Sequence, residues 1–284
     1  MPVALRDVVQ EPIATKSAIR LALQSSEGLN TVWAVVEAED DVRVYRQFLD
    51  EEVVNIKPST DESGKKSYKN VEDIVTSIVS EVSGSRIFGI RDKDYSIYEV
   101  ANYVPLPNVF LTDRRDLEMM LLESESVQSA MEEWVVNFRN RLSVAIDVAK
   151  WMGYLRICNS VNDFGYTFKN RFKASVVWDQ NSHSLMKDWK ERCSALLKDY
   201  ISSDDINCFI EERSLEQEHA YDICRGHDVV KLLSWLLVKT EFSTDEIARK
   251  MASSYSLADF VQTSLYSSIQ EWQTSKDISF LKAL

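Results

Sequence analysis

Short apolar runs alternate with helical patterns through the first 125 residues, and this alternation restricts the possible folds most strongly. The apolar runs are rich in β-branched or aromatic residues and occupy 32–36, 53–56, 86–90 and 108–111. Helical spacing of apolar side chains marks 14–25, 41–50, 71–82 and 114–122. Apolar strands that alternate with helices are typical of a parallel sheet covered on both faces. We therefore predict an α/β fold with a mainly parallel sheet flanked by helices.

Beyond residue 125 long helical patterns replace the alternation. They cover 127–151, 184–200, 204–218, 227–239 and 243–272. The change in pattern predicts two domains. Residues 1–125 form an α/β domain with an N-terminal helix, and residues 126–284 form a mainly helical domain for dimer, partner or substrate contacts.

Most of the net negative charge lies in the first half of the chain. The net charge is −12, and residues 1–125 carry 23 Asp and Glu against 14 Lys and Arg. A strongly acidic protein is a poor free-standing nucleic-acid binder, because phosphate contacts need cations. Solubility alone would account for the charge. The alternative is that the acidic residues bind divalent metals.

Other features favour a cytoplasmic protein without a membrane contact. No run approaches 18 uninterrupted apolar residues, and the start MPVALRDVVQEP lacks the pattern of a secretory signal. The four cysteines form no C-x-x-C pair. We interpret them as reduced thiols, mostly in the core.

Acidic residues follow three of the predicted strands, at the point where each strand ends. They are Glu37 after the first, Asp92 and Asp94 after the third, and Asp113, Asp116 and Glu118 after the fourth. Ligands of open α/β sheets gather outside the carboxyl ends of the strands. These carboxylates are therefore expected at one edge of the sheet. If a helix begins near residue 38, Asp41 lies one turn beyond Glu37 and faces the same way.

Each acidic cluster also has a simpler interpretation. Asp113 suits a helix N-cap, and the pair Asp92 and Asp94 suits a solvated turn. The convergence of three clusters on one edge favours a metal site over three separate coincidences. Carboxylate ligands without His or Cys suit Mg²⁺ or Mn²⁺.

These motifs carry a resemblance to a known family. The elements VVEAEDDVRVY and RIFGIRDKDYS resemble the TOPRIM domain, in which a Glu-containing strand–helix element precedes D-x-D. Together with GKKSYKNVEDIV and LTDRRDLEMMLL, they resemble the OLD-like TOPRIM nucleases of anti-phage defence loci, a family that includes the nuclease effector of the PARIS system. The resemblance covers residues 15–125 well and continues weakly at RGHDVVKLL, where His227 replaces a family Lys.

The resemblance implies a TOPRIM-like sheet and assigns roles to individual residues. The implied catalytic residues are Glu37, Asp92, Asp94, Glu118 and Lys65, the last in a Gly-Lys element. The implied metal ligands are Glu37, Asp41, Asp92, Asp94, Asp116 and Glu118, with Mg²⁺ or Mn²⁺ as the cofactor. One position departs from the family pattern, because Ala38 stands where TOPRIM domains usually have Gly.

Cationic residues give candidates for nucleic-acid binding. They are Arg114 and Arg115 beside the acidic residues, and Lys169, Arg171 and Lys173 interleaved with aromatic residues from 164 to 172. Aromatic side chains beside cations often hold single-stranded nucleic acid. An amphipathic strand explains the second group equally simply, and pairing with Glu118 could explain the arginines. The dispersed histidines His183, His219 and His227 suit structural roles.

Two classes of function remain after this comparison. The first is a metal-dependent phosphodiesterase, in which metals activate water and no covalent protein nucleophile is needed. For this class the resemblance implies a nuclease effector that cleaves RNA, specifically tRNA, as a homodimer after release from a partner ABC-type ATPase. The second class is a non-catalytic ATPase-binding regulatory subunit. A DNA-directed TOPRIM nuclease is a further alternative. The complete set of acidic residues favours the enzyme.

Overall fold

A computed structural model describes residues 12–60, 68–99, 103–165, 174–179, 181–182, 184–197, 201–237 and 242–283. The chain divides into two compact units, each made of separate stretches. The sheet unit comprises Met1–Asp92, Val104–Asp113 and Ser256–Leu284, and the helical unit comprises Lys93–Tyr103 and Arg114–Tyr255. This division differs from the predicted single break after residue 125. The reason is that the last segment of the chain packs in the sheet unit.

The sheet unit contains four parallel strands in the order β2-β1-β3-β4. The strands are β1 Val32–Val36, β2 Val54–Pro58, β3 Ile87–Arg91 and β4 Val109–Leu111. All five residues of both β1 and β3, the two central strands, are buried. The predicted α/β class is therefore confirmed, with a parallel sheet flanked by helices and a helical C-terminal half.

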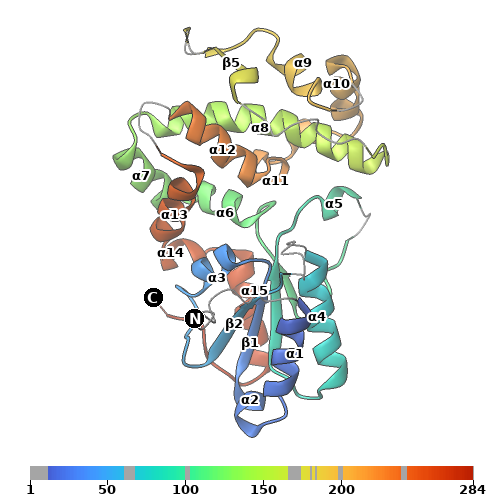
Figure 1. Ribbon diagram of the computed structural model, residues 1–284, viewed down its shortest axis with the longest axis vertical. Coiled ribbons are helices and arrows are strands. Elements are labelled where there is room, and N and C mark those ends of the chain that lie inside the picture. The colour runs from blue at the N-terminus through green and yellow to red at the C-terminus, as the bar shows by residue number, and fades with distance from the viewer. Residues whose placement is uncertain are drawn as a thin grey trace, which may run out of the picture. The chain divides into compact units, whose positions relative to one another are not determined.

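Two helices cover one face of the sheet, α1 Pro12–Ala22 and α4 Tyr68–Glu81 (Figure 1). Their apolar side chains meet alternate residues of the strands, including Trp33, Val35 and Ile87. Gly89 lets α4 approach closely, because a Cβ atom at this position would collide with Val71. Alternate apolar residues of the strands and the apolar face of α4 thus form one hydrophobic core.

The other face is covered partly by the end of the chain. Helix α3 Glu39–Tyr45 packs there against β1 and β2, and α15 Ser264–Ser275 against β4. The ring of Phe88 on β3 lies 5.0 Å from that of Trp272 and 5.6 Å from that of Phe280, measured between ring centroids. The segment after α15 is also bonded through its backbone, since Asp50 donates its N–H to the Phe280 carbonyl at 2.8 Å.

The helical unit is organised on the long helix α8 Phe138–Val161, which buries residues on several faces. Helices α11 Ala220–Ile223 and α12 Gly226–Leu236 lie along it (Figure 1). The unit also contains the short helices α5 Ser96–Glu99, α6 Leu117–Glu123 and α9 Trp189–Ser194. The longer ones are α7 Glu125–Trp134, α10 Ser203–Glu212 and α13 Thr244–Ser254. Two short strands, β5 Trp178–Asp179 and β6 Ser184–Leu185, form a separate hairpin.

Four of the five predicted long helices differ from the structure. The described residues of 184–200 form strand β6 and the short helix α9, and the pattern over 204–218 ends with α10 before Ser214, which has a left-handed φ of 53°. Two further patterns are broken although their apolar spacing continues. The pattern over 127–151 divides into α7 and α8 at Asn137, which adopts a left-handed φ of 61°. The pattern over 243–272 divides into α13, α14 Leu257–Phe260 and α15, because Ser256 and Thr263 cap new helices. At these breaks the next helix begins after a polar N-cap residue, Asn137, Ser256 or Thr263, while the apolar spacing continues.

Two further observations concern membranes and thiols. Along the described part of the chain, no helix combines the length and apolar character needed to cross a bilayer. The four cysteines are free thiols, three of them buried and Cys208 exposed. Burial raises the pKa of the Cys193 thiol to about 12, which keeps it protonated and unreactive.

Candidate metal site at the ends of the central strands

Two of the predicted acidic residues meet at the carboxyl ends of β1 and β3. Glu37 follows β1 directly, and Asp92 follows β3. The backbone N–H of Asp92 donates a hydrogen bond of 2.9 Å to Oε1 of Glu37. Both residues are partly exposed. The meeting follows from the parallel pairing of the two strands, which brings their carboxyl ends to the same edge.

Glu37 and Asp41 do not share one helical turn. Helix α3 starts at Glu39, and Ala38 before it has an extended backbone with φ −145° and ψ 171°. Glu37 therefore precedes the helix. The Asp41 carboxylate instead accepts the N–H of Ala38 at 2.7 Å and closes the first turn of α3. The structure gives Asp41 a capping role, while its role as a metal ligand stays a prediction.

The alanine at position 38 fits its place in the structure. An extended backbone needs no glycine, and the Ala38 side chain is buried without a left-handed φ. The departure from the family pattern therefore causes no backbone strain at this position.

Asp113 caps a helix that is distant in the sequence. Its two carboxylate oxygens accept the N–H groups of Ser264 and Leu265 at 2.7 and 2.8 Å, at the start of α15. The carboxylate also complements the positive end of the helix dipole. The capping interpretation of Asp113 holds, although the helix that it caps begins about 150 residues later.

The other predicted ligands belong to the helical unit, and two of them are joined by Arg115. Its guanidinium lies 2.5 Å from Oδ2 of Asp116 and 3.1 Å from Oδ1 of Asp94. It also stacks on the Tyr95 ring at 4.3 Å. Arg115 is buried, which favours a structural role over the predicted contact with a nucleic-acid phosphate. Asp94 itself has a left-handed φ of 49°, a conformation that Asp tolerates better than most residues.

Asp116 has structural partners on both sides. It is the N-cap of α6, where it accepts the N–H of Met119, and it also accepts the N–H of Gly226 at 2.9 Å. A side chain at Gly226 would collide with Asp116 and with Glu118. The glycine of the Arg-Gly-His-Asp element is therefore required here, because α6 and the Gly226 backbone approach each other closely. Glu118 lies in the first turn of α6 and is partly exposed.

Arg114 is held by carboxylates of the same unit. It pairs with both oxygens of Glu123 at 2.5 Å and with Asp222 at 3.3 Å. Asp222 also accepts from Lys93 at 3.2 Å. These ion pairs give Arg114 a structural role, and its predicted contact with nucleic acid stays a prediction. Nothing in the sequence pattern pointed to Asp222, because its partners are about 110 and 130 residues away.

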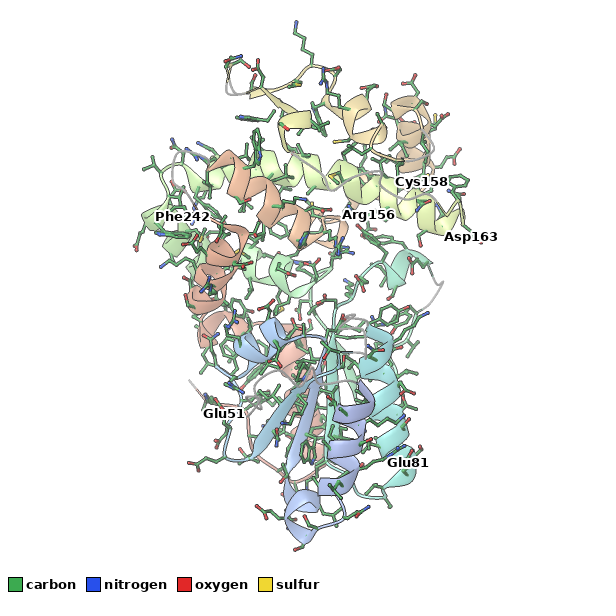
Figure 2. All side chains as sticks on the ribbon, in the orientation of Figure 1. Glu51, Glu81, Arg156, Cys158, Asp163 and Phe242 are labelled. Atoms are coloured by element: carbon green, nitrogen blue, oxygen red, sulfur yellow. The ribbon has the colours of Figure 1, made fainter. Side chains whose placement is uncertain are left out.

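The rest of the Arg-Gly-His-Asp element is also structural. Asp228, on α12, lies 2.6 Å from Nη1 of Arg156 on α8, and Arg156 is labelled in Figure 2. Burial and the nearby Arg225 charge lower the pKa of His227 below its ordinary value. The imidazole is therefore neutral at pH 7, in contrast to the lysine of the family element.

Several predicted residues lie outside the described ranges. They are Lys65, Lys169, Arg171, Lys173 and His183.

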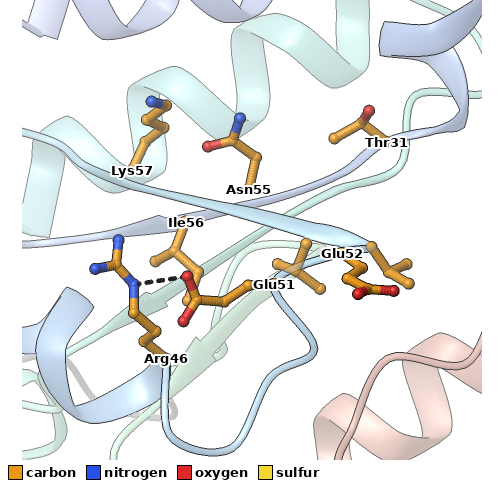
Figure 3. A pocket seen from close by; sticks show the side chains of 9 residues that line it. Thr31, Arg46, Glu51, Glu52, Asn55, Ile56 and Lys57 are labelled. Carbon is orange, nitrogen blue, oxygen red and sulfur yellow. Dashed lines mark ion pairs between the residues drawn. The ribbon is translucent and has the colours of Figure 1, made fainter.

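Two surface hollows lie away from Glu37 and Asp92. One of about 360 Å³ runs along the edge strand β2 and contains the ion pair of Arg46 and Glu51 (Figure 3). Its charges are of both signs, so it favours no ligand. The other, of about 390 Å³, is lined by Cys158 of α8 and by residues of α10.

The chemistry of Glu37 and Asp92 suits a magnesium-type ion, because both carry carboxylate oxygens. Among the residues that the structure describes, no three His, Cys, Asp or Glu side chains gather to enclose an ion. Mg²⁺ seldom needs such an enclosure, because it commonly binds through one or two carboxylates, several waters and substrate phosphates. Two oxygen donors at a partly exposed strand edge suit this mode of binding.

Comparisons with known proteins do not assign the chain to a family. No family model matches it, and no curated protein matches its sequence.

Proposed function

We propose that the chain is a divalent-metal-dependent nuclease effector of a bacterial anti-phage defence system. The observation that supports this most is the hydrogen bond from the Asp92 backbone to Glu37, which fixes two carboxylate residues at neighbouring strand ends. The resemblance of the surrounding motifs to OLD-like TOPRIM nucleases supports the same function. It also favours RNA, specifically tRNA, as the substrate and the cytoplasm as the location.

Glu37 and Asp92 would hold Mg²⁺ or Mn²⁺ at the edge of the sheet. A bound ion of this kind lowers the pKa of the attacking water and stabilises charge on the phosphate oxygens. Glu37 would orient the water and accept its proton, because a carboxylate fixed by the Asp92 N–H presents its lone pairs in a constant direction. Asp92 would be a second carboxylate ligand of the ion, at a position fixed by the bond between its backbone and Glu37. The roles of Asp94, Asp116 and Glu118 in catalysis stay predictions.

Metal binding by the wild-type chain and two variants tests this proposal. Asp92→Asn removes one charge at the strand edge, and we expect it to weaken Mn²⁺ binding at least roughly tenfold. Asp73→Asn is the matched control, because Asp73 is an exposed acid of the same unit, paired with Lys16. It should leave the affinity unchanged. Titration calorimetry measures all three. Equal Mn²⁺ affinity in wild type and Asp92→Asn would contradict the proposal.

A non-catalytic subunit that binds an ATPase is the second candidate. It is favoured by the ion pairs of Arg115 with Asp94 and Asp116, which give these acids partners without any metal. Detectable Mg²⁺-dependent cleavage of RNA by the purified chain would exclude this candidate.

We also propose, from the resemblance, that an ABC-type ATPase of the same locus restrains the nuclease and that the released chain acts as a homodimer. Co-expression of both proteins with a tag on the chain should recover the ATPase in the same fraction. Size measurement by light scattering before and after release should then detect a dimer. If the ATPase passes through the column while the tagged chain is retained, the partner is wrong.

A further inference from the structure

Arg91 is a buried cation directly beside the proposed site. It is the last residue of β3, and its side chain is 0% exposed. A buried charge is costly unless partners compensate it. The partners that compensate the buried charge of Arg91 also fix the position of its guanidinium.

Three groups surround the guanidinium of Arg91. Its Nε lies 2.9 Å from Oε1 of Glu72, on the first half of α4. Its Cζ lies 4.6 Å from the centroid of the Tyr68 ring, at the start of the same helix. Its Nη1 donates a hydrogen bond of 2.7 Å to the backbone carbonyl of Asp92. Glu72 and Tyr68 thus fix a planar group that holds Asp92 through Nη1.

The backbone of Asp92 is consequently held at both ends. Its N–H is bonded to the Glu37 carboxylate and its C=O to the Arg91 guanidinium. The carbonyl of Arg91 itself accepts the N–H of Thr112, beyond the end of β4. If Arg91 released the Asp92 carbonyl, the 92–93 peptide could rotate, and the backbone torsions of Asp92 would change. The adjoining N–H of Asp92 would then shift, and its bond to Glu37 would weaken.

We propose that Arg91 is a positioning residue for the metal site, acting through Asp92 on Glu37, with Glu72 and Tyr68 as its support. This inference rests on the proposed function. A purely structural role, in which Arg91 only fastens α4 to β3, would affect stability and leave metal affinity unchanged.

Arg91→Lys tests the proposal because it keeps the charge and removes the planar fork. A single ammonium group cannot reproduce the geometry with which the guanidinium faces Glu72 and the Asp92 carbonyl together. We expect Mn²⁺ affinity to fall roughly 10- to 100-fold, as for other residues that orient metal ligands. Arg20→Lys is the matched control, since Arg20 pairs with Glu81 at the opposite end of α4. Its Mn²⁺ affinity should equal that of wild type.

A second measurement needs no metal. Amide hydrogen exchange at Asp92, followed by mass spectrometry or NMR, should be faster in Arg91→Lys than in wild type and unchanged in Arg20→Lys. If Arg91→Lys does not fold, Glu72→Gln takes its place, because it withdraws the charge that supports the guanidinium. The same loss of affinity and the same faster exchange are expected.

The outcomes separate this inference from the proposed function. A folded Arg91 variant with wild-type Mn²⁺ affinity overturns the inference and leaves the proposed function intact. Failure of the wild-type chain to bind Mn²⁺ overturns the proposed function. In that case the exchange at Asp92 decides the positioning role: faster exchange in Arg91→Lys supports it, and unchanged exchange overturns it.

Discussion

Glu37→Gln should abolish most of the nuclease activity while leaving the fold intact. The amide oxygen of Gln can still accept the Asp92 N–H, so the ends of β1 and β3 stay joined. The substitution removes the negative charge and the basicity. Loss of a general base alone lowers the rate by ~10²–10⁴-fold, and the loss of a metal ligand adds to this.

Cleavage of RNA in the presence of Mg²⁺ measures this effect, and thermal unfolding verifies the fold. Glu39→Gln provides the matched control, because Glu39 is an exposed acid at the start of the adjacent helix α3. The control should cleave at the wild-type rate and arrest growth when the defence system is triggered. Full activity of Glu37→Gln would show that the ends of β1 and β3 are not the active site.

Asp228→Ala should be the most destabilising of the substitutions considered. It leaves Arg156, whose side chain is 18% exposed, without the carboxylate 2.6 Å away. Removal of one partner from a buried ion pair typically costs about 3–5 kcal/mol in the free energy of unfolding. Urea unfolding of wild type and variant gives this difference directly.

An exposed ion pair of the same unit serves as the comparison. Asp188 and Arg192 lie one helical turn apart, with side chains 57% and 44% exposed. Asp188→Ala should therefore leave the unfolding transition almost unchanged. The double variant Asp228→Ala/Arg156→Met should recover much of the lost stability, since it removes the Arg156 charge together with the carboxylate that balances it. If Asp228→Ala unfolds like Asp188→Ala, the buried pair contributes little.

The sheet could be predicted from the sequence because burial on both faces leaves a distinctive pattern. The apolar runs predict β1 at its observed residues, β3 and β4 within one residue, and β2 within two. The meeting of Glu37 with Asp92 followed from a general rule for parallel strands. The new helix starts after Asn137 and Ser256 could not be predicted, because the apolar spacing continues across them.

Long-range partners explain what the sequence could not predict about the acidic residues. Asp116 is a predicted ligand by its position after a strand, but its bond to Gly226 spans 110 residues. Arg115 is predicted to bind nucleic acid, although it is buried against Tyr95. Arg91 had no predicted role at all. The local sequence pattern indicates which residues are buried and which form helices. The partner of a buried charge depends on the complete fold and cannot be found from that pattern.

The closing of the sheet unit by its last segment has a consequence for synthesis. During translation, β1, β3 and the residues that follow them emerge long before Ser256–Leu284, which supplies Trp272 and Phe280 to the ring of Phe88. A ribosome-bound or prematurely terminated chain that lacks this segment therefore leaves Phe88 and part of one face of the sheet uncovered. If the chain is the nuclease proposed above, this order of emergence delays completion of the sheet unit until residues 256–284 have been synthesised.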